Sequence, residues 1–224
     1  MTAMRRKVLL SWSSGKDSAW SLHTLRRDPS LEVVGLLTTL NEAFDRVAMH
    51  AVRAELLRLQ ATAAGLPSWP VPLPYPCSNE QYESIMAGVV AKAVADGVDA
   101  VAFGDLFLAD IRAYRERQMA GSGLDLLFPL WESDTAALAR EMVAAGLRAW
   151  VTSVDPRRLD ASFCGREWDA SFLDDLPAGV DPCGENGEFH TFVYAGPMLD
   201  RTLAVTRGEV VERDGYVFAD LLPA

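Results

Sequence analysis

The stretch of residues 8–18, VLLSWSSGKDS, places a short apolar run directly before a turn rich in serine and glycine. A continuous apolar run of this length is typical of a strand that is buried on both faces of a sheet. The residues that follow, 17–27, have the pattern of a helix, which Asp28 and Pro29 end. A strand, a tight turn and a helix in this order predict the first unit of a sheet that is wound by helices.

The alternation of strand and helix continues beyond this unit. Further strands are predicted at residues 32–40, 69–73, 98–103, 126–131 and 149–154, and further helices at 47–64, 78–97, 110–119 and 134–145. Ser78 and Gln81 form a capping box for the third helix. After Asp155 the pattern is irregular, with short strands predicted at 191–194, 203–206 and 210–218, the last turning at Asp214-Gly215.

This order of elements predicts an α/β fold in two parts. We expect a doubly wound, mostly parallel sheet in residues 1–121, followed by a smaller C-terminal α+β domain in residues 122–224. The boundary near residue 121 is placed by the change of pattern, since no linker composition marks it.

The composition argues against several classes of protein. The 224 residues contain no apolar stretch of 18 residues or more, so no membrane span is predicted, and the first apolar run is too short for a signal peptide. We therefore expect a cytoplasmic protein. The net charge of −10 repels a polyphosphate backbone, which argues against nucleic acid as the main partner. Three widely spaced cysteines favour neither a disulfide framework nor a zinc ribbon.

The turn at residues 11–18 has the features of an anion-binding loop. A glycine-containing turn lets backbone N–H groups point inward, and the start of a helix adds unpaired N–H groups and about +0.5 charge. Lys16 adds a positive charge, and a carboxylate such as Asp17 beside a polyphosphate needs a cation between them, for which Mg²⁺ is suited. We predict that this loop binds a polyphosphate through Ser11, Ser13, Ser14, Gly15, Lys16 and Ser18, with Mg²⁺ on Asp17.

A second polar motif lies at residues 181–191, DPCGENGEFHT. Glu185 and Glu188 flank a glycine-containing turn, and His190 follows. These groups are suited to binding a metal, orienting an amine or holding a substrate. Taken alone, the motif is more typical of a polar surface turn that leads into a strand.

The first loop is not the G-x-x-x-x-G-K-[ST] phosphate loop, because position 10 is Leu and Asp follows Lys16. It resembles the S-G-G-x-D-S loop of the PP-loop ATP pyrophosphatases, which belong to the adenine nucleotide alpha hydrolase-like (HUP) superfamily. Together, the two motifs resemble the diphthine–ammonia ligases, or ATP-dependent diphthamide synthetases, and their bacterial relatives in particular. The matching pieces extend over nearly the whole chain: residues 13–18, His50, Gly104-Asp105, Arg112 to Arg117, 129–131, Gly165-Arg166 and 184–191.

The resemblance implies an ATP-binding domain followed by a family-specific domain, and a reaction that uses ATP and Mg²⁺. A substrate carboxylate would attack the α-phosphate, pyrophosphate would leave, and ammonium or another amine would displace AMP. Backbone groups near Thr38 and Thr39 would meet the adenine, and Gly104 and Asp105, at the C-terminal end of a strand, would border the nucleotide. The expected catalytic residues are Lys16, Asp17, Glu185, Glu188 and His190, of which the last three would hold the ammonium or take its proton.

Two positions depart from the family pattern. Ser14 stands where the superfamily usually has Gly, and a serine is strained there if the backbone needs a positive φ. His190 stands where eukaryotic and archaeal members have Glu.

The sequence leaves several questions open. It does not name the carboxylate-bearing acceptor, a small molecule or a protein, and a homo-oligomer is compatible with it. A nucleotide-binding sensor without turnover and a PP-loop enzyme that modifies RNA remain as alternatives. Asp105 is suited to a site or to a helix cap, and His50 to packing or capping as well as to a site. For Arg112, Arg115 and Arg117, a solvated helix face and a contact with phosphate or substrate are equally compatible with the pattern.

Overall fold

The apolar run at residues 8–10 lies in β1 (Arg6–Ser11), in the middle of a parallel sheet. The computed structural model describes residues 4–42, 46–47 and 52–224. β1 pairs in parallel with β2 (Leu31–Asn41) along one edge and with β5 (Ala100–Ala102) along the other. This central position explains why the run is apolar on both faces.

Three further strands extend this sheet. β4 (Ser68–Leu73) pairs in parallel with β2, and β6 (Asp125–Leu127) pairs in parallel with β5. The short β3 (Arg46–Val47) pairs antiparallel with the end of β2. Five strands of the sheet are therefore parallel, in the spatial order β4-β2-β1-β5-β6.

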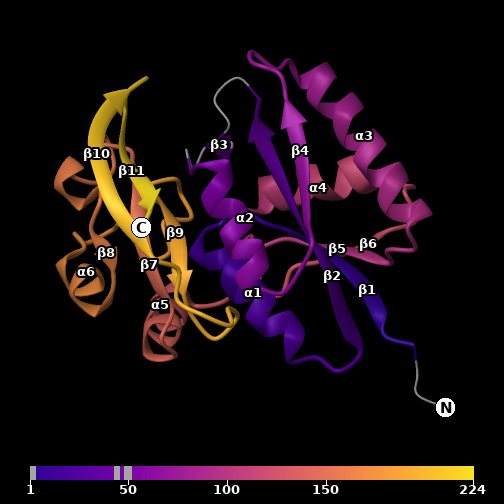
Figure 1. Cartoon of the computed structure of the whole chain (residues 1–224), viewed down its shortest axis with the longest axis horizontal. Coiled ribbons are helices and arrows are strands. Elements are labelled where there is room, and N and C mark those ends of the chain that lie inside the picture. The colour runs from indigo at the N-terminus through magenta and orange to yellow at the C-terminus, as the bar shows by residue number, and fades with distance from the viewer. Residues whose placement is uncertain (1–3, 43–45, 48–51) are drawn as a thin grey trace.

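Helices cover both faces of this sheet (Figure 1). α1 (Lys16–Arg26) and α2 (Ala54–Ala63) share a hydrophobic core with Val8 and Leu10 of β1. α3 (Asn79–Ala95) and α4 (Ala109–Met119) contribute to a separate core on the other face, which contains Leu9. The alternation of side chains along β1 thus divides its apolar run between the two cores.

The order of the strands reverses beside β1. After β1 the chain passes through α1 to β2 on one side, and it later returns to β5 on the other side. In open α/β sheets, ligands bind at the carboxyl ends of the strands where the order reverses in this way. The turn that follows β1 lies at this switch point.

The second sheet is antiparallel and is built around β7 (Arg148–Val154). β9 (Phe189–Ala195) pairs with one edge of β7, and β8 (Glu167–Trp168) and β11 (Tyr216–Pro223) pair with the other. β10 (Val205–Arg213) pairs with β11 as the outer strand of a hairpin. α5 (Thr135–Ala144), a short 3₁₀ helix (Ala161–Phe163) and α6 (Ala170–Asp175) complete this part of the chain.

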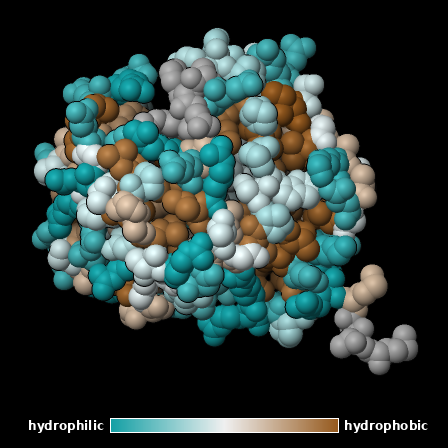
Figure 2. All heavy atoms as spheres, viewed as in Figure 1, coloured by the Kyte–Doolittle hydropathy of each residue, from teal (hydrophilic) through white to brown (hydrophobic). Residues whose placement is uncertain are grey.

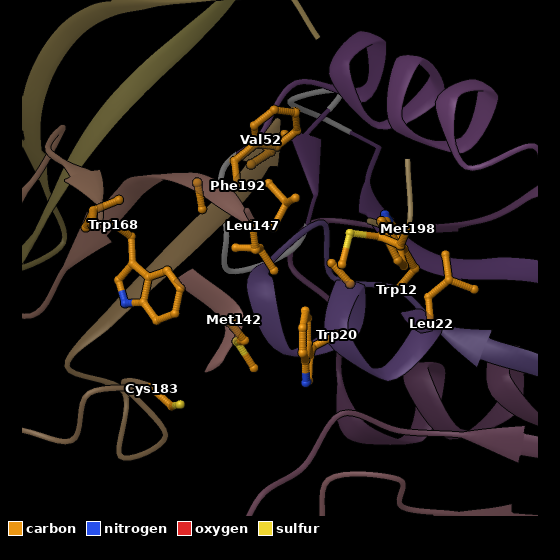
Figure 3. Close-up of a cluster of buried hydrophobic side chains, with 14 of the residues drawn as sticks. Trp12, Trp20, Leu22, Val52, Met142, Leu147, Trp168, Cys183, Phe192 and Met198 are labelled. Carbon is orange, nitrogen blue, oxygen red and sulfur yellow. The ribbon is translucent and has the colours of Figure 1, made fainter. Parts of the chain in front are cut away.

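The two sheets share one hydrophobic core, which α1 and α2 help to form. Figure 3 shows Trp20 and Leu22 of α1 in the same cluster as Met142, Leu147 and Phe192. Polar contacts cross the same boundary: Arg26 Nη1 donates to the carbonyl of Met198 at 2.9 Å, and the amide of Asp200 donates to the carbonyl of Ala63 at 2.8 Å.

The predicted fold class is confirmed: a doubly wound α/β core and a smaller domain with an antiparallel sheet. The capping box is also present, since Gln81 N donates to Ser78 Oγ at 3.2 Å and Ser78 N donates to Gln81 Oε1 at 3.0 Å. Asp214 and Gly215 form the predicted turn, with φ angles of 52° and 78°. In the described ranges, no helix is both long enough and apolar enough to cross a membrane.

Some predicted boundaries are wrong. The second helix begins at Ala54 instead of Val47, because Val47 belongs to β3. The strand expected at 126–131 ends at Leu127, where the chain turns. The two last strands are β10 and β11, so the segment predicted as one turning strand contributes to both. The division at residue 121 remains a prediction; β6, four residues further on, still pairs in the first sheet.

Candidate active site

The turn after β1 leads directly into α1, and the first N–H groups of a helix have no partner within it. The amide of Gly15 donates to Ser13 Oγ at 3.3 Å, and that of Lys16 donates to Thr191 Oγ1 at 3.1 Å. The amide of Ser18 has no acceptor among the described residues, whereas the amide of Asp17 donates to the carboxylate of its own side chain. The amide of Ser18 therefore remains for an anion at the start of the helix, where the helix dipole favours negative charge.

Ser14 has the positive φ that would strain a serine, with a value of 71°. Its carbonyl accepts hydrogen bonds from Val193 N and Gln60 Nε2, each at 3.0 Å, and the residue is fully buried. Gly15 is extended, but an added Cβ would lie 3.1 Å from the carbonyl oxygen of Thr191. The strain at Ser14 and the need for glycine at position 15 both follow from the close approach of β9.

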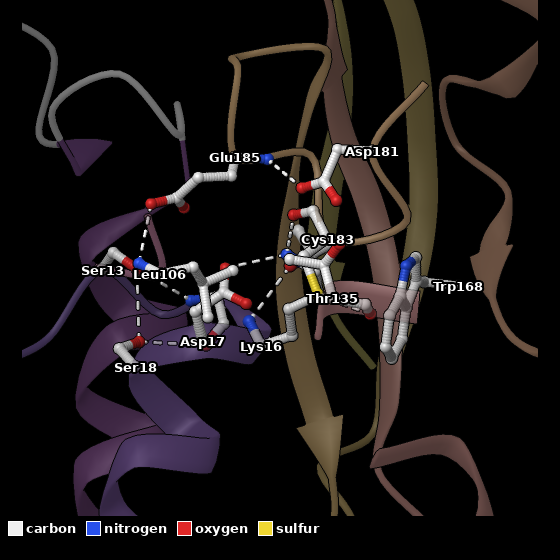
Figure 4. Close-up of polar contacts among 12 residues, drawn as sticks. Ser13, Lys16, Asp17, Ser18, Leu106, Thr135, Trp168, Asp181, Cys183 and Glu185 are labelled. Atoms are coloured by element: carbon white, nitrogen blue, oxygen red, sulfur yellow. Dashed lines mark hydrogen bonds and ion pairs between the residues drawn. The ribbon is translucent and has the colours of Figure 1, made fainter. Parts of the chain in front are cut away.

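Lys16 is almost completely buried, and its amino group is already bound to protein groups (Figure 4). Nζ donates to Asp17 Oδ2 at 2.8 Å and to the carbonyl of Cys183. Burial opposes a charge on the amine, but the charge and hydrogen bond of Asp17, together with the charges of Cys183 and Asp181, hold the pKa of Lys16 above its ordinary value. Lys16 is therefore a fixed positive charge that ties the first loop to the second motif. The other oxygen of Asp17, Oδ1, is buried without a hydrogen bond.

The second motif forms a turn that sends its two glutamates in different directions. Glu185 Oε1 accepts a hydrogen bond from Leu106 N at 2.8 Å, so its side chain reaches towards the segment after β5 (Figure 4). Glu188 Oε1 instead accepts from Asp181 N at 3.2 Å and from Asn186 Nδ2 at 3.0 Å. Glu188 therefore stabilises the turn through hydrogen bonds within the second motif, while Glu185 extends towards the first loop.

The titration of Glu185 and His190 is shifted in opposite directions. Burial raises the pKa of Glu185 to about 7, although the hydrogen bond from Leu106 N opposes the shift. Burial, with the Lys16 charge, lowers the pKa of His190 to about 4. At neutral pH, Glu185 can accept or release a proton, whereas His190 is a neutral imidazole.

These groups line one pocket of about 320 Å³. It brings together most of the predicted residues: Ser11, Ser13, Gly15, Lys16, Asp17, Ser18, Gly104, Asp105, Glu185 and His190. Glu188 and Ser14 are not in its lining. The two sequence motifs, 175 residues apart at Lys16 and Thr191, thus meet across a single hollow.

A second pocket of about 290 Å³ adjoins the first. Ser11, Ser13 and Arg115 line both pockets. Thr38 and Thr39, predicted to lie near a base, line the second pocket, and Thr38 Oγ1 donates to the carbonyl of Trp12 at 2.7 Å. The first pocket is polar and begins at a helix N-terminus, and the second is lined mainly by apolar side chains. A phosphate chain suits the first and a flat base suits the second.

Comparisons with known proteins agree with this geometry. A family model described as the diphthamide synthase N-terminal domain matches residues 4–126, more than half of the chain. The chain belongs to the diphthamide synthase family. The C-terminal domain model of the same family matches residues 134–219, so both domains of the family are represented. The resemblance to the diphthine–ammonia ligase family is confirmed, and the likeness to bacterial members in particular stays a prediction.

Relatives of this diphthamide synthase family member carry the name diphthine–ammonia ligase. The human protein is 27% identical over 149 residues, which cover 64% of this chain and 55% of the human one. The zebrafish (Danio rerio) protein is 32% identical over 131 residues, covering 54% and 50%, and that of Schizosaccharomyces pombe is 31% identical over 120 residues, covering 51% and 20%. The chain spans about half of the length of the human and zebrafish relatives, and less of the yeast one.

In this diphthamide synthase family member, Asp105 is not a helix cap. It forms a two-pronged ion pair with Arg115, with distances of 2.5 Å to Nε and 3.0 Å to Nη2. Gly104 packs against the start of α1, since an added Cβ would lie 3.1 Å from Ser18 N. Arg112 stacks 4.7 Å from the ring centres of both Phe128 and Trp131. Arg117 is exposed on α4.

His50 lies outside the described residues. Gln60 of α2, by contrast, is a residue that sequence reasoning missed. Its side chain is fully buried, accepts from Trp12 Nε1 at 3.0 Å, and donates to the carbonyls of Ser14 at 3.0 Å and Val193 at 2.6 Å. The signal was present, because Gln60 follows Leu56 by four residues and so interrupts the apolar stripe of its helix.

The metal prediction can be tested against the donor groups. No cluster of three or more His, Cys, Asp or Glu side chains converges within the described part of the chain. Mg²⁺ commonly takes only one or two protein carboxylates and completes its shell with phosphate and water. Asp17 lines the pocket, and its Oδ1 atom is a buried acceptor without a hydrogen-bond donor. This atom is therefore suited to be the protein ligand of Mg²⁺.

Proposed function

We propose that this protein is an ATP-dependent ligase that adenylates a carboxylate and then transfers the acyl group to ammonia or another amine. One observation carries the proposal: a helix N-terminus, with the amide of Ser18 uncommitted among the described residues, and a titratable glutamate line the same pocket at the switch point of the sheet. The first feature is suited to a polyphosphate, and the second to proton transfer. The name shared by the relatives, diphthine–ammonia ligase, supports a ligase that uses ammonia.

ATP would lie across the two adjoining pockets. Its adenine would occupy the apolar pocket beside Thr38 and Thr39, and its phosphates would reach the amide of Ser18. Lys16, fixed at the pocket wall, would stabilise negative charge that develops on the departing pyrophosphate. This contribution consists of position and electrostatics, because the charge is held in place before the reaction.

Mg²⁺ is part of the proposal. Asp17 would hold it through Oδ1, and the ion would supply positive charge to the phosphate oxygens. The pocket lining has the carboxylates of Asp17 and Asp105 and a partly ionised Glu185 against two cations, Lys16 and Arg115, so it carries no excess of positive charge. A tetra-anionic nucleotide therefore needs an additional cation in this pocket.

The second half-reaction requires a group that receives a proton from the attacking amine. A carboxylate oxygen of the acceptor first forms a bond to the α-phosphorus and pyrophosphate leaves; the amine nitrogen then bonds to the acyl carbon and AMP leaves. Of the three predicted groups, Glu185 is best suited to take the proton, because it lines the pocket and its pKa is about 7. His190, with a pKa of about 4, is a poor base at neutral pH but can accept a hydrogen bond from ammonium.

The test has a binding part and a turnover part. Lys16→Met keeps most of the side-chain volume and removes the charge, and it should weaken α,β-methylene-ATP by about tenfold or more in calorimetry. Metabolite and protein extracts, screened with wild-type protein for AMP and pyrophosphate, should contain an acceptor that releases both together. Lys16→Met should release neither at a comparable rate.

Lys92→Met is the matched control, since Lys92 is an exposed lysine on α3. It should bind the analogue and release AMP as the wild type does. A wild-type protein that binds the analogue but releases no AMP with any extract would favour the sensor and contradict the ligase. Equal activity of Lys16→Met and wild type would remove Lys16 from the mechanism.

A further inference from the structure

A third hollow, of about 480 Å³, lies between α3 and α4. We call it the α3–α4 pocket and define it by six of its lining residues: Tyr82, Met86, Val90, Phe103, Arg115 and Met119. These same six residues also line the pocket proposed for adenine. The two spaces are therefore neighbours that share a wall, and the α3–α4 pocket is larger than the one beside it.

The packing of α3 leaves this space accessible. Only Ala93 of its 17 residues is fully buried, although the helix is rich in apolar side chains. Val94 and Tyr114, which also line the α3–α4 pocket, are 46% and 36% exposed. Figure 2 shows hydrophobic residues on the neighbouring surface over α3 and β4. Apolar surface in a concave site of this size is typical of a site for a small molecule.

Arg115 supplies the polar end of this pocket. Its Nε and Nη2 atoms bind Asp105, and its guanidinium lies 4.3 Å from the centre of the Phe103 ring. Nη1 has no acceptor among the described residues, so its N–H groups are available. Arg115 also lines the pocket that holds Lys16 and Glu185, and it is thus common to all three hollows.

We propose that the α3–α4 pocket binds the acceptor, and that this acceptor is a small carboxylic acid with an aromatic or branched apolar body. The inference rests on the proposed ligase function and deepens it by naming the class of substrate. The apolar body would lie between α3 and α4, and the carboxylate would turn towards Nη1 of Arg115. A carboxylate is the natural partner of a guanidinium that still has free donors, and from Arg115 it would face the phosphate pocket.

The test uses two probes that differ only in the acidic group, 4-phenylbutyrate and 4-phenylbutanol. Ligand-observed NMR should show saturable binding of the acid to the wild type, with the alcohol about tenfold weaker. Ala91→Trp fills the α3–α4 pocket, since Ala91 is exposed, lines this pocket and does not line the other two. It should weaken the binding of 4-phenylbutyrate by about tenfold or more and leave the affinity for α,β-methylene-ATP within about twofold of the wild-type value.

Ser84→Trp is the matched control, because Ser84 is exposed on the same helix and is not in the pocket lining. It should bind the acid as the wild type does. Equal binding of the acid by Ala91→Trp and wild type, displacement of the acid by the ATP analogue, or the absence of saturable binding to the wild type would each overturn the proposal. So would a wild-type dimer that Ala91→Trp dissociates, since a second copy would then occupy the pocket. If the wild type fails to bind the ATP analogue while the probe results hold, the ligase function falls and the apolar acid site stands.

Discussion

Opposing effects act on the pKa of the Glu185 carboxyl group. Burial raises its pKa to about 7, the hydrogen bond from Leu106 N acts against this, and the nearby Asp17 charge adds to the rise. We predict that the Glu185 carboxyl carbon, followed by ¹³C NMR, titrates near pH 7. The folded state then binds more protons than the unfolded state between the ordinary value of 4.5 and about 7, so this group reduces stability as the pH rises through that window.

Glu185→Gln identifies the resonance and should remove this part of the pH dependence of unfolding. Asp17→Asn should move the titration to lower pH, because it removes a neighbouring negative charge. A Glu185 resonance that titrates between pH 4 and 5 would show that the carboxyl is solvated, and the role as proton acceptor would lose its physical basis.

At the scale of single residues, the sequence predicted the chemical groups of the site, but it did not predict which contacts those groups make. Residue types indicated an anion-binding loop at Lys16 and Asp17, and the resemblance to a known family was needed to place Glu185 at the same site. They did not distinguish Glu185 from Glu188, because both flank the same turn and only the backbone path decides which one faces the pocket. The sequence predicted that Ser14 is strained if its φ is positive. The observed φ of 71° depends on contacts from α2 and β9, which are remote in sequence.

At the scale of elements, Gln60 joins three segments that meet at the site. It links α2 to the turn after β1 and to β9, through hydrogen bonds to Trp12, Ser14 and Val193. We predict that Gln60→Leu weakens α,β-methylene-ATP by about tenfold, because the turn loses the contact that holds Ser14 in its strained conformation. The buried groups left without partners should also reduce the free energy of unfolding by about 1–3 kcal/mol.

Gln118→Leu is the control, since Gln118 is an exposed glutamine on α4. It should leave both quantities close to the wild-type values. Gln60→Glu keeps the acceptor for Trp12 and loses the donors to Ser14 and Val193, so the nucleotide affinity should also fall in this variant. Full affinity in both Gln60 variants would show that the turn keeps its shape without this residue.

The elements were predictable where local signals agreed. Periodicity and the capping box placed α3, and the Asp214-Gly215 turn marked the hairpin of β10 and β11. The prediction failed at Val47, where a residue of the supposed helix pairs with the end of β2. Such a pairing is decided by the neighbouring strand and not by the helical periodicity of the residues that follow.

At the scale of the whole molecule, the alternation of strands and helices predicted the doubly wound sheet, but not how the second sheet packs on it. That arrangement depends on a core to which both parts contribute. Leu22 of α1 and Val52 before α2 lie in the same cluster as Met142, Leu147 and Phe192 (Figure 3). An apolar face on a helix predicts that this face will be buried, but it does not indicate which element will pack against it.

This shared core leads to the last prediction, that the two domains unfold as one unit. In urea, tryptophan fluorescence and far-UV circular dichroism should give coincident transitions, because separating the domains would expose a core common to both. Leu147→Ala removes a fully buried side chain of the second domain, and it should reduce the free energy of unfolding by about 2–5 kcal/mol. The free energy of opening measured by amide hydrogen exchange in β1, in the other domain, should fall by the same amount. Leu222→Ala, at a site that is 37% exposed, should change little. If Leu147→Ala instead produced two separate transitions and left the exchange in β1 unchanged, the domains would unfold independently and the prediction would be wrong.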